Sequence, residues 1–432
     1  MSDSAADPYL SEVDDKLIGG TVMGGMIGNF IEWYDWTIYG LLSSVFAAQF
    51  FPSDNAITSL LATLATFALG FVMRPVGSIV LSPMADKYGR RKMLSLTILL
   101  MGAGSLIVAV TPSYARIGIT APLLLLFARL LQGFSAGGEF QGAAAFLVEH
   151  APRERRGFVG SLHLASIGFA VLVATGVSAL TTNFIAQPAL SEWGWRIPFL
   201  IGAILSLYGL YIRIGLPETP HFVAVEQQRA VESRPILRAL KDHPWESFVV
   251  FAMQMGTVQL YIWTVFLPTY AHLAGGLPLG QGLIGGVISL AVFCVVTPAA
   301  GALSDRIGRR PLLIAYAIGF IVLAWPMLHL LQNGDFMTFL AVDIVGCILL
   351  AMVDGVLSAT LCELFPTAVR TSGIGFPYAV CAAIFGGTAP LIAAWLISIH
   401  RPSLIAVYIM AIAAIGGITF VRMRETRGVS LH

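Results

Sequence analysis

The segment SPMADKYGRRK, residues 82–92, recurs later in the chain as GALSDRIGRRP, residues 301–311. In both copies an Asp precedes a Gly by three residues and an Arg by four, and the two Asp residues are 219 positions apart (305 − 86 = 219). A second pair of similar segments, EHAPRERRG (149–157) and ELFPTAVRTSG (363–373), has an offset of 214 (363 − 149 = 214). Two nearly equal offsets indicate that the second half of the chain repeats the architecture of the first.

The amino-acid composition indicates that this duplicated chain lies in a membrane. Of its 432 residues, 57% are hydrophobic and 11% are charged, and the mean hydropathy is +0.81, whereas ordinary soluble domains carry about 25% charged residues. A helix that crosses a bilayer needs roughly 20 mostly apolar residues, and we find no alternating strands of the kind that build membrane barrels. Twelve apolar runs are therefore predicted to be transmembrane helices, at 17–49, 57–81, 93–111, 120–148, 158–184, 196–215, 246–272, 281–303, 311–332, 336–362, 371–399 and 403–421.

The positions of Lys and Arg predict the orientation of the chain. If both termini are cytoplasmic, 20 of the 25 basic residues fall in cytoplasmic segments, as the positive-inside rule requires. The predicted fold is an all-α membrane protein with two pseudo-symmetric six-helix bundles. Its segments are a cytoplasmic tail (1–16), an N-terminal bundle (17–215), a cytoplasmic linker (216–245), a C-terminal bundle (246–421) and a second cytoplasmic tail (422–432). Parallel repeats are typical of one class of secondary transporter, whose substrate site lies near the bilayer midplane between the halves.

Several sequence blocks resemble a known transporter family. The Asp-containing loop of both halves is similar to the signature of the major facilitator superfamily. Five further blocks resemble the metabolite:proton symporter family within it: GNFIEWYDWTIYG (28–40), MRPVG (73–77), ARLLQGFSAGGEF (128–140), WGWRIPF (193–199) and ELFPTAVRTSGIGF (363–376). That family includes carriers of citrate, 2-oxoglutarate, shikimate and proline/betaine. The resemblance implies the major facilitator fold, alternating access and a multi-pass protein of the bacterial inner membrane. Ser82 stands where the first loop usually has Gly, which indicates looser packing there.

Ionisable residues inside the predicted spans are the candidates for proton coupling. Glu32 and Asp35 are three residues apart and share one face of the first helix, while Arg129 and Glu139 lie in the fourth predicted span. Charged groups at this depth are costly and usually functional. The resemblance implies that the first and fourth helices line the cavity, which makes an ion pair between Asp35 and Arg129 the expected arrangement.

Separation of that pair is predicted to drive the coupling. A carboxylate in a low-dielectric site binds a proton more tightly unless a cation lies beside it. If Arg129 moves away as the halves rock, Asp35 takes up a proton, and the reformed pair releases it. Asp35 is the first candidate, followed by Glu139 and Glu32; the alternative is a permanent structural salt bridge that does not titrate.

A cationic side chain in the second span predicts the class of substrate. Arg74 is not obviously required for pairing, and its planar guanidinium suits a carboxylate, so we expect it to bind an organic anion together with Arg129. Other candidate substrate contacts are polar or aromatic residues within spans: Tyr34, Tyr39, His163, Gln254, Gln259, Tyr261, Tyr378 and Asp354. For the aromatic residues the alternative is packing or an interfacial position. For His163 the alternative is a structural hydrogen bond.

The repeated loops are predicted to form a cytoplasmic gate. An Asp in such a loop can accept hydrogen bonds at a neighbouring helix N-terminus, where the dipole favours an anion. The gating candidates are Asp86, Arg90, Arg91 and Glu149 in the first half and Asp305, Arg309, Arg310, Glu363 and Arg370 in the second. We expect them to hold the outward-open state and to separate on rocking. The alternative for the basic residues is membrane topology alone.

Other classes of function find little support in the sequence. No nucleotide-binding Gly-x-x-x-x-Gly-Lys loop and no His or Cys pair at metal spacing occurs, so neither an enzyme nor a cofactor or metal is expected. The predicted partners are a small organic acid, protons and the lipid bilayer, without nucleic acid, and the protein is expected to be a monomer. A citrate-like or 2-oxoglutarate-like di- or tricarboxylate is the favoured substrate. The alternatives are a zwitterionic osmolyte such as proline or betaine, or an uncoupled channel or sensor; the short tail after Val421 weighs against an osmolyte carrier.

Overall fold

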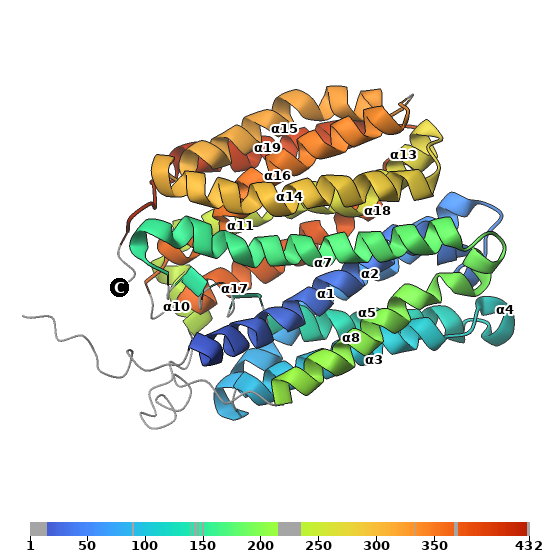
Figure 1. Cartoon of the computed structure of the whole chain (residues 1–432), viewed down its shortest axis with the longest axis horizontal. Helices are drawn as coiled ribbons and strands as arrows, with labels where there is room; N and C mark the ends of the chain where they lie inside the picture. Colours follow the sequence, from blue (N-terminus) through green and yellow to red (C-terminus); the bar gives the residue numbers. More distant parts are fainter. Residues whose placement is uncertain are drawn as a thin grey trace, which may run out of the picture.

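The computed structural model describes residues 15–88, 90–138, 140–141, 144, 147–148, 151–214, 235–332, 334–366 and 370–429. The side chains of some helical residues, among them 15–26 and 82–91, are likewise not described. Within these limits the protein is helical, and its long helices lie side by side in two groups (Figure 1).

The first half contains six long helices. They are α1 (Asp15–Phe50), α2 (Ala56–Tyr88), α3 (Arg90–Val110), α5 (Thr120–Ser135), α7 (Arg156–Phe184) and α8 (Arg196–Ile214). Short elements connect or extend them: α4 (Tyr114–Ile117), η2 (Ala136–Gly138), η3 (Arg153–Arg155) and η4 (Leu190–Gly194). Their lengths follow from apolar runs that continue until a charged or Pro-containing segment allows the chain to turn.

The second half repeats this pattern with two interrupted helices. Its elements are α10 (Pro235–Asp242), α11 (Pro244–Gln254), α12 (Thr257–Tyr261), η5 (Ile262–Phe266), α13 (Leu267–Gly275), α14 (Leu279–Ile307), α15 (Arg310–Leu330), α16 (Phe336–Leu364), α17 (Arg370–Cys381), η6 (Ala382–Gly386), α18 (Thr388–Ser398) and α19 (Ser403–Arg422). The segments η5 and η6 are π-helical turns within the seventh and eleventh predicted spans. Such turns often occur at functional sites because they displace one residue from the regular helical register.

The structure confirms the predicted helical fold. Each of the twelve predicted spans coincides with one long helix or with a consecutive series of helical segments. In the described part of the chain, nine helical runs are long and apolar enough to cross a membrane. Most of the predicted linker, 216–245, lies outside the described residues, as does nearly all of the tail 1–16. The cytoplasmic placement of both termini stays a prediction.

The two halves meet chiefly along α7. This helix packs against α14 and α16 of the second half, and α2 packs against α17 and α18 on the other side of the interface. In Figure 1, α7 runs alongside α14 between the two groups of helices. Any cavity between the halves is therefore bounded by these helices.

Small residues allow α7 and α14 to approach closely near Gly157 and Gly301. A Cβ added at Gly301 would lie 2.5 Å from Oγ of Ser161 and 2.6 Å from the carbonyl oxygen of Gly157. Both distances are shorter than van der Waals contact, so only glycine fits at residue 301 in this arrangement. Small residues serve this purpose in membrane helix pairs in general, because they let the backbones meet.

We expect Gly301→Val to open this end of the interface. The added side chain would force α14 away from α7, and overpacking of a tight contact typically costs about 1–3 kcal/mol. Thermal unfolding of the purified protein, together with inter-helix distances between labels on α7 and α14, measures the effect. Gly176→Val is the control, because Gly176 lies on the partner helix α7 and no atom of a neighbouring element lies within 4 Å of a Cβ built there. Equal behaviour of the two variants would contradict the prediction.

Candidate functional site

The acidic pair of α1 faces the neighbouring helices of the first half. Asp35 is fully buried and accepts a hydrogen bond from the hydroxyl of Ser105 on α3. The side-chain amide of Gln132 on α5 lies 3.0 Å from Ser105 Oγ and 3.5 Å from Asp35 Oδ2, to both of which it donates. Arg129 donates from Nη1 to the carbonyl oxygen of the same Gln132 side chain. Asp35 is therefore linked to Arg129 through Gln132.

This arrangement differs from the direct ion pair expected between Asp35 and Arg129. The reason is that the guanidinium of Arg129 lies against aromatic faces, with its central carbon 4.0 Å from the ring centroid of Trp36 and 4.4 Å from that of Tyr39. Cation–π attraction is strongest where water is excluded. Arg129 is thus stabilised by aromatic rings of α1, and an amide bridges the remaining distance to the carboxylate.

The second acidic residue of α1 has a cation of its own. Glu32 forms an ion pair with Arg74 on α2, with 2.9 Å between Oε1 and Nη2, and both side chains are buried. The expectation that Arg74 is not needed for pairing is therefore corrected. The central carbon of Arg74 lies 4.3 Å from the ring centroid of Phe71 and 4.8 Å from that of Trp36. The indole of Trp36 consequently contacts the guanidinium groups of both Arg74 and Arg129.

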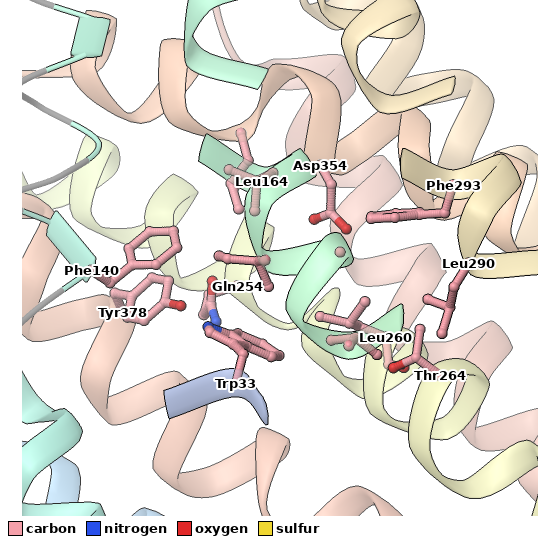
Figure 2. A pocket seen from close by; sticks show the side chains of 14 residues that line it. Trp33, Phe140, Leu164, Gln254, Leu260, Thr264, Leu290, Phe293, Asp354 and Tyr378 are labelled. Atoms are coloured by element: carbon pink, nitrogen blue, oxygen red, sulfur yellow. The ribbon is translucent and has the colours of Figure 1, made fainter. Parts of the chain in front are cut away.

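Two adjoining pockets lie between the halves and share Trp33, Phe140 and Tyr378. The larger spans about 430 Å³ and the smaller about 300 Å³, and both volumes include space that is open to solvent. The smaller is lined by Glu32, Trp33, Arg74, Ala136, Gly137, Phe140, Gln141, Tyr378 and Ala379. The larger is lined by Trp33, Phe140, Leu164, Ile167, Gly168, Val171, Gln254, Leu260, Thr264, Leu290, Phe293, Asp354, Leu357 and Tyr378, and Figure 2 labels ten of these residues.

The shared wall of the two pockets is aromatic. The rings of Phe140 and Tyr378 stack with their centroids 4.5 Å apart, which joins the two halves directly. Trp33 stacks on Tyr261 with a centroid separation of 5.7 Å. Thr264, in the π-helical turn η5, also reaches the larger pocket. The surfaces of both halves thus combine into one binding region, with the Glu32–Arg74 ion pair in the smaller pocket and Asp354 in the larger pocket, which Figure 2 shows.

The remaining predicted substrate contacts occupy different surroundings. His163 on α7 contacts Asn29 at 3.2 Å and Ser358 at 3.4 Å, so it bridges α1 and α16. Tyr34 donates to the carbonyl oxygen of Pro198 at 3.1 Å. Gln259 donates to the carbonyl oxygen of Ile409 at 3.3 Å. Tyr34 and Gln259 thus make hydrogen bonds between helices. Neither is among the described residues that line the two pockets.

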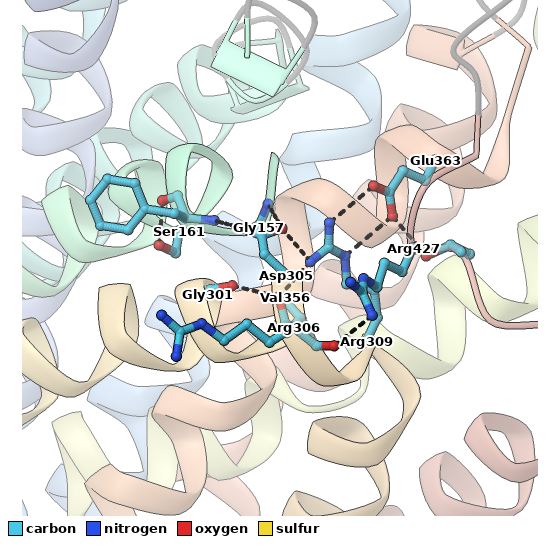
Figure 3. Close-up of polar contacts among 12 residues, drawn as sticks. Gly157, Ser161, Gly301, Asp305, Arg306, Arg309, Val356, Glu363 and Arg427 are labelled. Carbon is cyan, nitrogen blue, oxygen red and sulfur yellow. Dashed lines mark hydrogen bonds and ion pairs between the residues drawn. The ribbon is translucent and has the colours of Figure 1, made fainter. Parts of the chain in front are cut away.

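Three gating candidates of the second half, Asp305, Arg309 and Glu363, lie in one cluster (Figure 3). Asp305, near the end of α14, accepts hydrogen bonds from the backbone N–H groups of Gly157 at 2.8 Å and Phe158 at 2.9 Å, at the N-terminus of α7. Arg309 donates to Asp305 at 2.8 Å and to Glu363 at 3.1 Å. A carboxylate at a helix N-terminus is favoured by the helix dipole. These contacts therefore connect the two halves at this end of the interface.

The chain segment after α19 reinforces the same cluster. Glu425 accepts hydrogen bonds from the backbone N–H groups of Arg309 at 2.8 Å and Arg310 at 3.1 Å, and Thr426 donates to Glu363 at 2.8 Å. Partial burial acts to raise the pKa of Glu425, but these N–H donors outweigh it and hold the pKa below its usual value. Glu425 is therefore ionised near neutral pH and caps the start of α15.

Another gating candidate, Arg370, lies at the start of α17. Arg370 donates from Nε to the carbonyl oxygen of Cys362 at 3.0 Å, which fastens the start of α17 to α16. Five further residues with predicted roles either lie outside the described residues or have side chains that are not described: Asp86, Arg90, Arg91, Glu139 and Glu149. For these five the roles predicted from the sequence stay predictions.

Comparison with known proteins places the chain in a family. A sequence profile of the Major Facilitator Superfamily matches residues 25–376. The chain belongs to the major facilitator superfamily. This facilitator is 35% identical to the alpha-ketoglutarate permease of Escherichia coli (strain K12), over 99% of this chain and 98% of the permease. It is 36% identical to the citrate-proton symporter of Klebsiella pneumoniae, over 93% of this chain and 91% of the symporter.

Relatives with other substrates are equally similar. The facilitator is 35% identical to the glycine betaine/proline/ectoine/pipecolic acid transporter OusA of Dickeya dadantii (strain 3937), over 96% of this chain and 85% of the relative. The crystal structure of a D-xylose-proton symporter has the same fold, with a TM-score of 0.75 and 17% identity over 96% of this chain and 100% of that chain. The facilitator is thus a membrane transporter and not an enzyme.

Sequence reasoning missed several residues that this facilitator uses around its pockets. Gln132 and Ser105 connect Asp35 to Arg129, and Trp33, Phe140 and Thr264 line the larger pocket. The contact of Gln132 with Arg129 could have been predicted from the sequence, because Gln132 lies three residues after Arg129 and so shares its face of α5. Trp33 and Phe140 could not have been predicted as pocket residues, since aromatic side chains also occur widely as packing in membrane helices.

We expect Asp305→Asn to weaken the closure of the facilitator at the Gly157 end. The change removes the negative charge that accepts two backbone N–H bonds and pairs with Arg309, and hydrogen bonds to charged groups contribute about 1.5–3 kcal/mol each. Distances between labels on the two halves at that end should lengthen or broaden.

Asp335→Asn is the matched control for this experiment. Asp335 caps α16 by accepting from the backbone N–H of Thr338 at 2.9 Å, a contact within one half. The loss of this cap lowers stability without shifting the distances between the halves. The gate is refuted if Asp305→Asn leaves the inter-half distances unchanged.

Proposed function

We propose that this facilitator is a proton-coupled symporter that imports a small organic acid across the bacterial inner membrane by alternating access. The observation that carries the proposal is the buried ion pair of Glu32 and Arg74 at the edge of the binding region. The relatives named for citrate and alpha-ketoglutarate support the same class of substrate. Because both halves of the binding region lie in one chain, a single copy is sufficient for transport.

Arg74 supplies the group that recognises a carboxylate. Among the described residues lining the two pockets, it is the one cationic side chain. A guanidinium binds a carboxylate through two parallel N–H bonds and stays charged at any physiological pH. Glu32 occupies this guanidinium in the present state, so a substrate carboxylate has to compete with it.

This competition links substrate binding to proton uptake. If a substrate carboxylate displaces Glu32, the displaced side chain is left as an unpaired buried charge, which costs several kcal/mol. Taking up a proton removes that cost, because the neutral carboxylic acid is far easier to bury. Protonation of Glu32 and occupation of Arg74 therefore favour one another, and solute and proton cross together.

Asp35 provides a second place for a proton. In the present state its carboxylate receives hydrogen bonds from Ser105 and Gln132, which stabilise the ionised form. A rocking movement that separates α1 from α3 and α5 would remove these donors and favour protonation. Arg129 acts on Asp35 through Gln132 and stays within its aromatic surroundings.

A zwitterionic solute is the second candidate substrate. A relative named for glycine betaine, proline, ectoine and pipecolic acid is as similar to this chain as the organic-acid relatives are. The specific observation in its favour is that the larger pocket contains an acidic side chain, Asp354, and that Arg74 is the single cation among the described residues that line the two pockets. An uncoupled channel or sensor would differ from both candidates because it cannot accumulate the solute against a concentration gradient.

Uptake by the purified protein in proteoliposomes tests the proposal. An inwardly directed proton gradient should drive accumulation of a small carboxylate, and one pH unit corresponds to about 1.4 kcal/mol for each coupled proton. A protonophore should abolish the accumulation. Uptake that only equilibrates the solute, with or without the gradient, would contradict symport.

Glu32→Gln should separate binding from coupling. The amide mimics a permanently protonated Glu32, so Arg74 stays available and exchange of labelled for unlabelled solute continues. Accumulation driven by the pH gradient should be lost. Glu192→Gln, an exposed acidic residue in η4, is the control and should behave as the wild type. Full gradient-driven accumulation by Glu32→Gln would exclude Glu32 from the coupling.

Asp35→Asn tests the second proton site independently. We expect lower accumulation and a weaker dependence of uptake on external pH, because Asn cannot exchange a proton. Gln132→Met should reduce uptake less than Asp35→Asn, since it breaks the connection to Arg129 but keeps the carboxylate. Unchanged proton flux in Asp35→Asn would leave Asp35 with a structural role only.

A further inference from the structure

Asp354 is an acidic residue of the binding region that has no part in the proposed proton coupling at Glu32 and Asp35. It lies on α16, it is 7% exposed, and it lines the larger pocket, whereas Arg74 lines the smaller one. Figure 2 shows its carboxylate within the group of side chains around the pocket. No hydrogen bond or ion pair of Asp354 is seen in the described part of the chain, and the titratable groups that interact with it electrostatically, Tyr316 and Cys347, are neutral near pH 7.

The packing of α16 explains why this carboxylate faces the pocket. The next residue, Gly355, lies so close to α14 that an added Cβ would be 2.7 Å from the carbonyl oxygen of Thr297 and 2.9 Å from Cβ of Ala300. One turn further on, Ser358 contacts His163 on α7 at 3.4 Å. The helix is thus held by α14 and α7 on this side, and Asp354 is directed between the halves and not toward lipid.

We propose that Asp354 determines the charge selectivity of the transporter, by binding the cationic nitrogen of a zwitterionic solute whose carboxylate is held at Arg74. This inference rests on the proposed function, because it takes the carboxylate site at Arg74 as given. It adds a second recognition site in the larger of the two adjoining pockets and narrows the substrate to solutes that carry both charges.

The charge balance of the binding region favours such a solute. The ionisable residues that line the two pockets in the described part of the chain are Glu32, Arg74 and Asp354, beside the neutral Tyr378. With a proton on Glu32, a bound zwitterion places its carboxylate on Arg74 and its nitrogen on Asp354, so every charge has a partner. A dicarboxylate would bring its second anion toward Asp354, where none of the described lining residues is a cation, and specific binding sites avoid such a repulsion.

The aromatic wall between the two charged ends suits a cationic nitrogen. Trp33 and Tyr378 line both pockets, and Phe293 lies beside Asp354 in the larger one (Figure 2). Aromatic faces attract ammonium groups, and they attract methylated ammonium groups without requiring hydrogen bonds. Gln254 and Thr264 add polar groups at the same pocket. A primary amine and a quaternary amine are therefore both compatible with this end of the region.

Solutes of matched length test the proposal. Glutarate, γ-aminobutyrate and γ-butyrobetaine share a carboxylate and a three-carbon spacer and differ only in the group at the other end. Purified wild-type protein in proteoliposomes with an imposed proton gradient should take up the two zwitterions with a kcat/KM at least roughly tenfold above that for glutarate, a ratio that corresponds to one well-formed charge contact. Homologous series with shorter spacers should show the same order. A wild-type preference for the dicarboxylates would overturn the proposal.

Substitution of Asp354 tests the residue itself. Asp354→Asn should lower kcat/KM for the zwitterions by about ten- to a hundredfold, within the range for removing one charged partner, and should leave or raise that for glutarate. Asp354→Glu keeps the charge and should restore part of the zwitterion uptake. Asp343→Asn is the control, because Asp343 is equally buried on the same helix but is not among the described residues that line either pocket. An unchanged ratio of zwitterion to dicarboxylate uptake in Asp354→Asn would refute the assignment.

The outcomes distinguish this inference from the proposed function. If the wild type accumulates none of these carboxylates under a proton gradient, proton-coupled carboxylate import is wrong and Asp354 loses its premise. If the wild type accumulates glutarate better than the zwitterions, coupled import stands and the assignment of Asp354 is wrong. In that case Asp354 binds a proton instead, and Asp354→Asn should reduce the number of protons taken up with each glutarate.

Discussion

The cost of an unpaired charge away from water governs the arrangement of this protein. Glu32 is paired with Arg74, and Asp35 is reached by Ser105 and Gln132, which in turn contacts Arg129. None of these partners lies on the same helix as the carboxylate that it stabilises. The packing of α1 against α2, α3 and α5 consequently depends on whether Glu32 and Asp35 are ionised. A movement of these helices likewise changes the protonation of the two carboxylates. A carrier driven by protons needs such a dependence.

The two ends of the interface between the halves are held by different kinds of contact. At the Gly157 end, backbone contact between α7 and α14 is combined with Asp305, which accepts from the N-terminus of α7, and with Arg309 and Glu363. Around the pockets the contact is made by aromatic stacking of Phe140 on Tyr378. Charged hydrogen bonds are directional and are lost over a short displacement, whereas stacked rings can slide. The interface is therefore suited to open first at its polar end.

The sequence predicted the helices and the contacts of the loop containing Asp305 and Arg309 well, because both depend on local patterns; the gating role of that loop stays a prediction. Apolar runs of sufficient length can only be helices in a bilayer, and the repeated Asp, Gly and Arg spacing identified Asp305 and Arg309. The partners within the bundle were harder to predict. Helical periodicity places Glu32 and Asp35 on one face, but the rotation of each helix decides which neighbour they meet. The direct Asp35–Arg129 pair was wrong for this state because Gln132 lies between them, and Arg74 was expected to need no partner although it is paired with Glu32.

Trp36 contacts the guanidinium carbons of both Arg74 and Arg129, so the two charge clusters of the first half share one indole. A substitution that repositions Arg74 also changes the electrostatic surroundings of Arg129, although the two arginines lie on different helices. Amino-acid changes in one cluster are thus expected to show epistasis with changes in the other. During divergence of the family, the residues at positions 32, 35, 74 and 129 would then have to vary together, and a change in one of them is tolerated only in a background that already accommodates it.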